Sequence, residues 1–369
     1  MRVTLVIPSL WGGGAERVLS VLANGWVEQG DDVSILIFEP TGAPTYPIYP
    51  QVRVRYLDLV RRSHNLWEGL TQNFRRLRVL RRAIRESRPD IIVSFMSQTN
   101  VLTLLATRGL RSAVIISERT SPRRQAVGRL WRALRRLSYP LADALVCPTR
   151  SGLAGFQAIA RVRGATIPNP VEVPADRVRQ RGSRAGNLLI AMGRLIPEKG
   201  FDLLLEAFAR VGCRHPDWSL TIIGQGVLRS QLEEQSRGLK IAEKVHFAGH
   251  LADPFPLLCA GDLFVLSSRF EGFPMALAEA MACGLPVVSF DCPDGPREII
   301  RSGIDGVLVP PEDVDALAAA MDRLMSDGEE RARLAANALD VTTRFSKETV
   351  LSQWRQLFNE LLSTGKISH

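Results

Sequence analysis

The sequence predicts an α/β protein with two doubly wound domains, and three observations lead to this prediction. The chain has 369 residues, more than one hydrophobic core usually holds. Short apolar runs rich in β-branched residues alternate with helical patterns, which is typical of parallel sheets covered by helices. After a polar stretch that contains proline and arginine, from Pro168 to Gly186, the same alternation begins again.

The first half of the chain contains five predicted strands. Each is apolar along most of its length, as expected for parallel strands that are buried on both faces. They span Val3–Pro8, Asp32–Phe38, Ile91–Phe95, Ala113–Ser117 and Ala144–Pro148. Helical stretches lie between most of them, so we expect a Rossmann-like domain over residues 1–170.

The second half contains six predicted strands and ends in helices. The strands span Leu188–Met192, Leu220–Ile223, Val245–Phe247, Leu263–Leu266, Pro286–Phe290 and Val307–Val309. The closing helices are predicted near Glu312–Met325, Glu329–Thr343 and Lys347–Leu362. We therefore expect a second Rossmann-like domain over residues 171–345, joined by a linker from Pro168 to Gly186. The last helix, over residues 346–364, is expected to pack back on the first domain.

The composition is that of a globular protein in a reducing compartment. Hydrophobic residues make up 46% of the chain, and no apolar run approaches the roughly 18 residues that a membrane helix needs. The first residues, Met1–Pro8, lack the longer apolar region and cleavage site of a signal peptide. The five cysteines are scattered and form no CxxC pair, which argues against a disulfide framework or a zinc site. We expect a cytoplasmic location.

Positive charge is concentrated in the first half of the chain. Residues 1–170 contain 25 Arg, no Lys and 11 acidic residues, for a net charge of +14. Residues 171–369 contain 22 Lys plus Arg and 27 acidic residues, for a net charge of −5. The basic half indicates an anionic partner, for which nucleic acid, acidic lipid and a phosphorylated substrate all qualify.

A glycine-rich turn, Gly12-Gly13-Gly14, follows the first predicted strand and leads into a helix. Glycines let a ligand approach the backbone, and a helix N-terminus offers free N–H groups to an anion. The turn does not match GxGxxG, and a purely structural tight turn is the alternative interpretation. Its position at the carboxyl end of the first strand favours Gly13 and Gly14 as ligand contacts.

The second half opens in a similar way. Its first strand is followed by Gly193-Arg194-Leu-Ile-Pro-Glu-Lys199-Gly200 and a helix. Arg194 and Lys199 would place two cations on one strand-to-helix loop, where they could neutralise a diphosphate leaving group. A solvated loop with surface charges is the alternative.

A third motif lies in the segment Ser267–Ala280, in which Pro274 suits the first turn of a helix. Backbone N–H groups within residues 273–277 would then be free to contact phosphate oxygens. Glu271 precedes this helix and Glu279 lies within it, about 7 to 8 Å further along the axis. Such a separation suits two hydroxyl-rich groups on either side of a diphosphate, although both carboxylates could simply serve the helix dipole.

Together these motifs resemble the retaining glycosyltransferases of family four. That family has the GT-B fold, in which two Rossmann-like domains face each other across a cleft. The resemblance rests on GGGAER at residues 12–17, GRLIPEKG at residues 193–200, and an E-x7-E pattern formed by Glu271 and Glu279. It covers nearly the whole chain.

The resemblance implies a binding site for a nucleotide-sugar donor. Arg194 and Lys199 would hold the donor diphosphate and, with Glu271 on the transferred sugar, would be the catalytic residues. Glu279 would contact the ribose, while the loops at residues 224–226 and 249–251 would lie near the nucleobase. The expected donor-binding residues are Gly13, Gly14, Arg119, Gly193, Gly224, His250, Leu251, Gly272, Phe273, Pro274, Met275, Ala276, Leu277 and Glu279.

One residue departs from the family pattern. Many members carry a His in the N-terminal domain that contacts the donor sugar, and the matching stretch here is Ile116–Thr120. Either Arg119 replaces that contact or the sugar is held differently.

The chain also resembles bacterial transferases that extend undecaprenyl-pyrophosphate-linked oligosaccharides, including the Pgl-type N-acetylgalactosamine transferase. The shared features include Ile115–Glu118, Arg135–Pro140 and an arginine-rich helix near residues 70–88. Leu77, Leu80 and Ile84 would form the apolar face of this helix. The resemblance implies that an adjacent stripe grips the acceptor pyrophosphate and limits the number of additions; a solvated or lipid-facing helix is the alternative. The stripe consists of Arg75, Arg78, Arg82 and Arg85.

Neither a metal nor a cofactor is expected. Asp313-Val-Asp315 follows Pro310-Pro311 at a predicted helix start, which favours capping over metal binding. The five histidines are dispersed along the chain. In the reaction that the resemblance implies, the leaving phosphate oxygen takes the acceptor proton, so no catalytic base is needed.

The predicted function is transfer of a hexose or N-acetylhexosamine from a UDP-sugar to a lipid-linked or polysaccharide-precursor acceptor. The enzyme would associate peripherally with the inner membrane by binding the anionic surface of that membrane. A sugar-nucleotide epimerase of the same fold is one alternative. A basic nucleic-acid-binding protein is another, but aromatic residues make up only 7% of the chain and do not interleave with the arginines.

Overall fold

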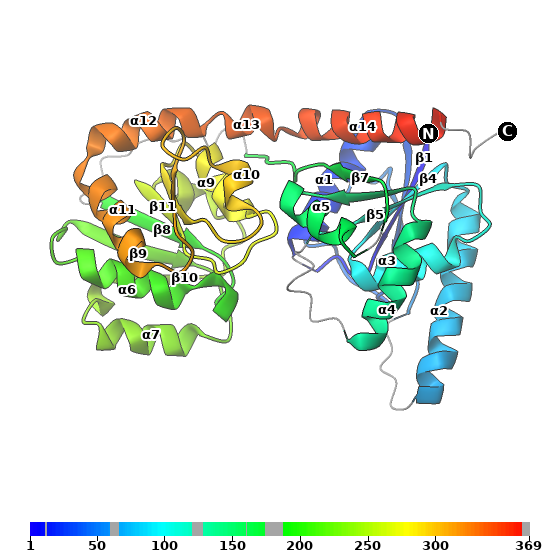
Figure 1. Cartoon of the computed structure of the whole chain (residues 1–369), viewed down its shortest axis with the longest axis horizontal. Helices are drawn as coiled ribbons and strands as arrows, with labels where there is room; N and C mark the ends of the chain where they lie inside the picture. Colours follow the sequence, from blue (N-terminus) through cyan, green and yellow to red (C-terminus); the bar gives the residue numbers. More distant parts are fainter. Residues whose placement is uncertain (12, 60–65, 120–127, 160, 174–186, 364–369) are drawn as a thin grey trace. The chain divides into compact units, whose positions relative to one another are not determined.

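A computed structural model describes residues 1–11, 13–59, 66–119, 128–159, 161–173 and 187–363. The chain forms two compact units (Figure 1). The first contains residues 1–170 together with residues 347–369, and the second contains residues 171–346.

The first unit is built on a parallel sheet of seven strands, in the order β3-β2-β1-β4-β5-β6-β7. Its order reverses beside β1, which is typical of a doubly wound sheet. The strands are β1 (Arg2–Ile7), β2 (Asp32–Ile37), β3 (Arg53–Tyr56), β4 (Ile91–Phe95), β5 (Ala113–Ser117), β6 (Ala144–Cys147) and β7 (Gly164–Thr166).

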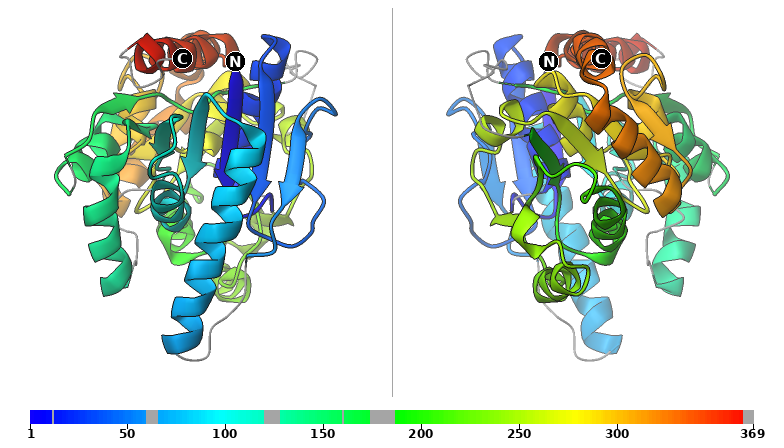
Figure 2. Two further views of the ribbon diagram at one scale, coloured as in Figure 1. Left: turned by 90° about the vertical axis from the view of Figure 1, so that its right-hand side faces the viewer. Right: turned by 90° about the vertical axis from the view of Figure 1, so that its left-hand side faces the viewer.

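Helices cover both faces of this sheet (Figures 1 and 2). One face carries α1 (Gly14–Glu28) and α14 (Lys347–Ser363). The other carries α2 (Leu66–Ser87), α3 (Ser97–Ala106), α4 (Arg129–Ser138), the short 3-10 helix η1 (Tyr139–Leu141) and α5 (Arg150–Gln157).

The second unit is built on a parallel sheet of six strands, in the order β10-β9-β8-β11-β12-β13. The strands are β8 (Asn187–Met192), β9 (Trp218–Ile223), β10 (Val245–Gly249), β11 (Leu263–Leu266), β12 (Val287–Phe290) and β13 (Val307–Val309). The prediction of two Rossmann-like parallel sheets is confirmed.

Helices also cover both faces of the second sheet. One face carries α6 (Phe201–Val211), α7 (Arg229–Gly238), α11 (Val314–Ser326) and α12 (Gly328–Ala338). The other carries α8 (Phe255–Cys259), α9 (Met275–Ala282), α10 (Pro296–Ile299) and α13 (Val341–Arg344). The 3-10 helices η3 (Pro197–Lys199) and η4 (Ala242–Lys244) lie in connections of this unit.

All eleven predicted strands are present, but two further strands escaped prediction. β3 has the sequence RVRY and is largely exposed, so it lacks the apolar run of a buried strand. β7 has only three residues, GAT, none of them fully buried. The single helix expected over Glu329–Thr343 is wrong, because the chain forms α12 and α13 with a break near Leu339 and Asp340. Most of the expected linker lies outside the described residues.

α14 packs against α1 through an aromatic cluster within the first unit. The rings of Trp26 and Trp354 are 5.8 Å apart, and those of Trp26 and Phe358 are 5.1 Å apart. All three side chains are fully buried. Burying rings of this size provides much of the apolar contact that fixes the last helix to the start of the chain.

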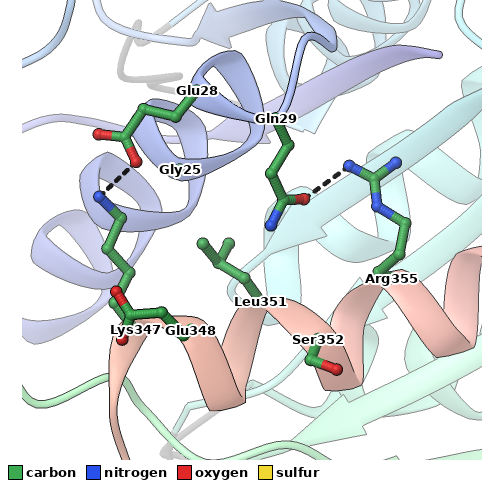
Figure 3. A pocket seen from close by; sticks show the side chains of 8 residues that line it. All are labelled: Gly25, Glu28, Gln29, Lys347, Glu348, Leu351, Ser352 and Arg355. Atoms are coloured by element: carbon green, nitrogen blue, oxygen red, sulfur yellow. Dashed lines mark hydrogen bonds and ion pairs between the residues drawn. The ribbon is translucent and has the colours of Figure 1, made fainter.

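Polar contacts flank the seam between the two helices (Figure 3). Lys347 Nζ lies 2.7 Å from a carboxylate oxygen of Glu28, and Arg355 donates a hydrogen bond of 2.7 Å to Gln29. Arg355 also pairs with the buried carboxylate of Asp31. Within the described residues, no helix is both long enough and apolar enough to cross a bilayer.

Candidate functional site

Most of the predicted site residues lie on loops at the carboxyl edge of the second sheet. These loops follow β8, β9, β10 and β11 and contain residues 193–200, 224–226, 249–251 and 267–277. In doubly wound sheets, this edge is the usual place for a ligand. The carboxyl ends of parallel strands thus bring motifs that are far apart in sequence to one edge.

Close backbone contacts hold three of these loops together. A Cβ atom on Gly224 would lie 1.9 Å from the carbonyl oxygen of Gly193, and Gly224 has φ of 145°. A Cβ atom on Gly226 would lie 2.2 Å from the carbonyl oxygen of Leu195. The amide of Gly224 donates a 2.8 Å hydrogen bond to the carbonyl of Gly249. Glycine is therefore required at residue 224 both by conformation and by space.

Lys199 and Glu271 form a close ion pair. Lys199 Nζ lies 2.5 Å from Glu271 Oε1, and the side chains are 21% and 8% exposed, respectively. Ser268 Oγ donates a 2.6 Å hydrogen bond to the same carboxylate oxygen. The positive charge of Lys199 is neutralised by the carboxylate of Glu271. An anionic ligand at Lys199 would therefore compete with Glu271 for the ammonium group.

Arg194 differs from Lys199 because it is exposed and, in the part of the chain that the structure describes, its guanidinium has no recorded acceptor. It follows Gly193 in the loop after β8. The two cations predicted on this loop therefore have different states: Lys199 is held by a carboxylate, and Arg194 is available to a ligand without losing a protein contact.

Arg269 connects the loops on either side of this pair. Its guanidinium donates hydrogen bonds of 2.8 and 2.6 Å to both carboxylate oxygens of Asp202, and one of 2.9 Å to the carbonyl of Pro197. Nε donates a further bond of 2.9 Å to Glu312. Arg269 lies two residues before Glu271, and Pro197 two residues before Lys199, so this bidentate contact fixes the spacing of the two loops.

We expect Asp202→Asn to destabilise the protein by about 1 kcal/mol at neutral pH, because it removes a charged, bidentate partner of Arg269. Partial burial opposes ionisation of Asp202, but its hydrogen bonds with Arg269 outweigh this and hold the pKa of Asp202 below its usual value. The stabilisation is therefore fully present above the unfolded pKa near 4 and is lost as the pH falls through the lower folded pKa.

The measurement is the difference in unfolding free energy between the parent protein and Asp202→Asn from pH 7 to pH 3. Asp315→Asn is the matched control, since its carboxylate pairs with Arg210 but is 90% exposed. A difference for Asp202→Asn that stays constant over this range would contradict the role assigned to its charge.

The helix α9 begins one residue later than predicted. Pro274 is its N-cap residue and Met275 its first helical residue, so the expectation that Pro274 lies in the first turn is wrong. The amide of Leu277 donates a 3.1 Å hydrogen bond to the carbonyl of Pro274, so Leu277 is not the free donor that was expected. The amides of Met275 and Ala276 lie at the helix start, where intrahelical acceptors are absent.

The loop before α9 lies close against the loop after β12. Gly295 has φ of 119°, and a Cβ atom there would lie 2.8 Å from Cδ of Pro274 and 3.1 Å from the carbonyl oxygen of Gly272. Phe273 is buried and its ring contacts that of Phe345 at 5.4 Å. These contacts restrict the backbone conformation of the residues between Glu271 and α9.

Glu279 and the base loop have contrasting environments. Glu279 lies within α9 and is only 3% exposed. His250 is exposed and Leu251 is half-buried, directly after β10. Because Glu279 is buried, its carboxylate has a restricted position, as a specific ligand contact requires. The side chain of His250 is in solvent.

The glycine turn of the first unit contains a carboxylate. Gly13 is the N-cap of α1, and a Cβ atom there would lie 2.2 Å from Oε2 of Glu16. Glu16 is buried and accepts a 3.3 Å hydrogen bond from Ser9 Oγ. Gly13 therefore makes room for Glu16, and this structural role exists beside the ligand contact predicted for Gly13 and Gly14. Gly12 lies outside the described residues.

Arg119 follows β5 in the first unit. Its Nη1 donates a 2.7 Å hydrogen bond to Asn169, and its guanidinium lies over the ring of Phe95, 5.3 Å from the centroid. Nε and Nη2 are buried and have no partner among the described residues. Burial lowers the pKa of Arg119 to about 10. This guanidinium has spare donors, as a ligand contact would require.

The arginine stripe of α2 is exposed along one side of the helix. Arg75, Arg78, Arg82 and Arg85 are all exposed, while Leu80 and Ile84 are fully buried. Arg82 Nε lies 2.8 Å from Glu86, so one of the four cations is already paired. The guanidinium of Arg78 lies over the exposed ring of Phe74 at 5.1 Å. Arg75 and Arg85 have no recorded acceptor within the described residues.

Within the described residues, no group of three or more His, Cys, Asp or Glu side chains is arranged to hold a metal ion. Asp313 instead caps α11, because its carboxylate accepts a 2.9 Å hydrogen bond from the amide of Ala316. The capping role predicted for this residue is confirmed.

The comparisons with known families decide the class of protein. Residues 13–170 match the family described as "Glycosyl transferase 4-like domain", and residues 175–341 match "Glycosyl transferases group 1". Together the two matches span most of the chain. The chain is a glycosyltransferase.

Relatives and solved structures agree with this assignment. The glycosyltransferase is 29% identical to the Campylobacter jejuni enzyme named GalNAc-alpha-(1->4)-GalNAc-alpha-(1->3)-diNAcBac-PP-undecaprenol alpha-1,4-N-acetyl-D-galactosaminyltransferase, over 98% of this chain and 99% of that one. Sucrose-phosphate synthase from Thermosynechococcus elongatus has a TM-score of 0.83 at 18% identity, covering 98% and 99% of the two chains. Anabaena Alr3699/HepE, solved with UDP, has a TM-score of 0.79 at 20% identity, covering 98% and 100%.

These matches confirm the predicted family and the GT-B class of fold. They give no support to the alternatives of an epimerase or a nucleic-acid-binding protein.

Two features of this glycosyltransferase were not predicted from its sequence. Arg269 and Ser268 lie inside the motif around Glu271, and an arginine so close to a predicted site residue could have indicated a positioning role. Glu118 is buried after β5 and accepts hydrogen bonds from Ser97 at 2.7 Å and Asn100 at 3.1 Å, and also from the Tyr139 hydroxyl. Burial and the adjacent carboxylate raise the pKa of Tyr139.

Proposed function

We propose that this glycosyltransferase moves a hexosyl or N-acetylhexosaminyl group from a UDP-sugar to a lipid-linked or polysaccharide-precursor acceptor, with retention of configuration. The observation that carries the proposal is the pairing of Lys199 with Glu271, beside the exposed Arg194 and the start of α9. A carboxylate that releases an ammonium group to an incoming diphosphate becomes free to contact the sugar attached to it.

The proposed donor site uses groups at the carboxyl edge of the second sheet. Arg194 and Lys199 bind the diphosphate, and the amides of Met275 and Ala276 add donors at the start of α9. Glu271 contacts the transferred sugar and Glu279 the ribose. UDP as the nucleotide is supported by the UDP complex of the Anabaena relative in fold.

In the proposed reaction, the acceptor hydroxyl oxygen forms a bond to the anomeric carbon as the bond from that carbon to the phosphate oxygen breaks. Attack occurs from the face that the nucleotide leaves, so configuration is retained. The hydroxyl proton moves to the leaving phosphate oxygen. Arg194 and Lys199 stabilise the charge that grows on the diphosphate. Arg119, with its two spare donors, is proposed to contact the donor sugar.

The acceptor assignment draws on the Campylobacter relative, whose name specifies a glycan on undecaprenyl pyrophosphate. We propose a similar lipid-linked acceptor here, bound by the first unit at the surface of the inner membrane. The net charge of +14 over residues 1–170 suits a pyrophosphate and an anionic lipid surface.

A donor screen tests the proposal. Purified protein is incubated with a panel of UDP-, GDP- and TDP-sugars and a lipid-linked acceptor, and release of each nucleoside diphosphate is measured. We expect acceptor-dependent release from one or a few UDP-sugars. Release that occurs only from GDP- or TDP-sugars would remove UDP from the proposal.

The arginine stripe of α2 gives a separate prediction about the acceptor. Arg75→Ala combined with Arg85→Ala should raise the KM for a pyrophosphate-linked acceptor about tenfold, because it removes two unpaired cations from a forked phosphate contact. Hydrolysis of the donor in the absence of acceptor should be unchanged. The measurement is initial rate against acceptor concentration, in detergent solution.

The matched control is Arg108→Ala combined with Arg111→Ala, which removes the same charge from exposed residues of the same unit. Equal KM values in the two double variants would reduce the stripe to a nonspecific contribution to net charge. If the parent enzyme adds several sugars, Arg75→Ala or Arg85→Ala should also shift the product length distribution.

A further inference from the structure

The helix α4 exposes two of its apolar side chains to solvent. Leu130 is 68% exposed and Leu137 is 74% exposed. They are seven residues apart in α4 and therefore lie on the same face. Leu141, at the end of η1, is also exposed, at 41%. Single exposed leucines are ordinary, but a row of three along one helical segment is not.

The opposite face of α4 buries polar groups. Arg135 is 3% exposed and its guanidinium lies over the ring of Phe156, 5.5 Å from the centroid. Ser138 is 2% exposed. Trp131 and Leu134 pack partly against the core. Apolar packing therefore does not account for Leu130 and Leu137, which lie on the side away from the sheet.

Positive charge flanks the exposed leucines. α4 contains four arginines and no acidic residue, RLWRALRRLS. Arg132 and Arg136 are exposed, one turn apart, and neither has a recorded acceptor in the part of the chain that the structure describes. Helices that bind at the interface of an anionic bilayer typically combine exposed leucines with unpaired arginines, as α4 does.

The position of α4 in the first unit is compatible with contact to an anionic bilayer. α3 contacts both α2 and α4, so the three helices form one layer on one face of the first sheet (Figure 1). α2 carries the arginine stripe on this same layer, together with the exposed ring of Phe74. A protein partner would also cover leucines, but unpaired cations on both helices favour a surface that is anionic over a wide area.

We propose that α4 is a membrane-docking helix, which inserts Leu130, Leu137 and Leu141 into the interface of an anionic bilayer while Arg132 and Arg136 contact lipid phosphates. This rests on the proposed function, because a lipid-linked acceptor requires the enzyme to work at a bilayer. It assigns the contact to one helical segment, separate from the stripe that is proposed to bind the acceptor.

Vesicle flotation tests the assignment. The full-length protein is mixed with vesicles of phosphatidylethanolamine and phosphatidylglycerol, or of phosphatidylcholine alone, and the bound fraction is measured. Leu130→Ser combined with Leu137→Ser should weaken binding to the anionic vesicles about tenfold. Ile304→Ser combined with Leu339→Ser is the matched control, since both residues are exposed and apolar and lie in the second unit. This control should bind like the parent protein.

Charge is tested with Arg132→Gln and Arg136→Gln, each expected to weaken binding to anionic vesicles about fivefold. Parent binding to phosphatidylcholine should be weak. Transfer to a detergent-dissolved acceptor should be normal in all of these variants, which separates this inference from the proposed function. Unchanged vesicle binding by the double leucine variant would overturn the assignment. If the parent protein self-associates and that variant loses self-association while vesicle binding stays intact, the leucines cover a protein interface and the assignment is also overturned.

Discussion

The single variants Lys199→Ala and Arg194→Ala should each lower kcat by about a hundredfold or more, because each variant lacks one cation that would stabilise the departing diphosphate. The two variants should differ in stability. Lys199→Ala leaves the carboxylate of Glu271, which is 8% exposed, without its ion-pair partner, at a cost of about 3 kcal/mol. Arg194→Ala removes an exposed side chain and should leave the unfolding free energy within about 0.5 kcal/mol of the parent value.

The measurements are steady-state transfer rates and urea unfolding of the same preparations. Arg237→Ala is the control, because this arginine is exposed on α7, away from the site loops in sequence. Transfer rates within threefold of the parent value in both Lys199→Ala and Arg194→Ala would remove these residues from the mechanism.

Glu271→Gln should lower kcat/KM for the UDP-sugar by about a hundredfold, while the affinity for UDP alone stays the same or rises. The amide keeps the shape of the carboxylate but loses its charge, so the contact with the transferred sugar and the positioning of that sugar are weakened. Lys199 loses its competing partner at the same time, and it remains available for the diphosphate of the nucleotide.

Calorimetric titration with UDP and initial-rate kinetics with the UDP-sugar provide the two values. Glu198→Gln is the matched control, since this residue lies in the same loop as Lys199 and is exposed. A parallel loss of UDP affinity and turnover in Glu271→Gln would place the carboxylate at the nucleotide instead of at the sugar.

The sequence was a good guide to the elements that have one dominant physical cause. Buried parallel strands such as β4, β5 and β11 have the predicted boundaries because each is apolar along most or all of its length. β3 and β7 lack such a run, since one is a largely exposed edge strand and the other has three residues. The break between α12 and α13 also follows no glycine or proline, so nothing local indicated it.

The sequence motifs predicted which residues belong to the site, but they did not predict the contacts between those residues. Lys199 and Glu271 are 72 residues apart, and their pairing depends on β8 and β11 being neighbours in the sheet. The clamp formed by Arg269 likewise depends on tertiary packing with Asp202. Helical spacing predicted the stripe of α2 correctly as an exposed row, yet it could not show that Arg82 is paired with Glu86.

In the proposed reaction, a sugar leaves a nucleoside diphosphate and reaches its acceptor with configuration retained. The most direct test is the anomeric configuration of the product, measured by NMR from a UDP-α-sugar and a lipid-linked acceptor. We expect an α-linked product together with one equivalent of UDP. A β-linked product would contradict it, because attack would then have come from the face opposite the nucleotide.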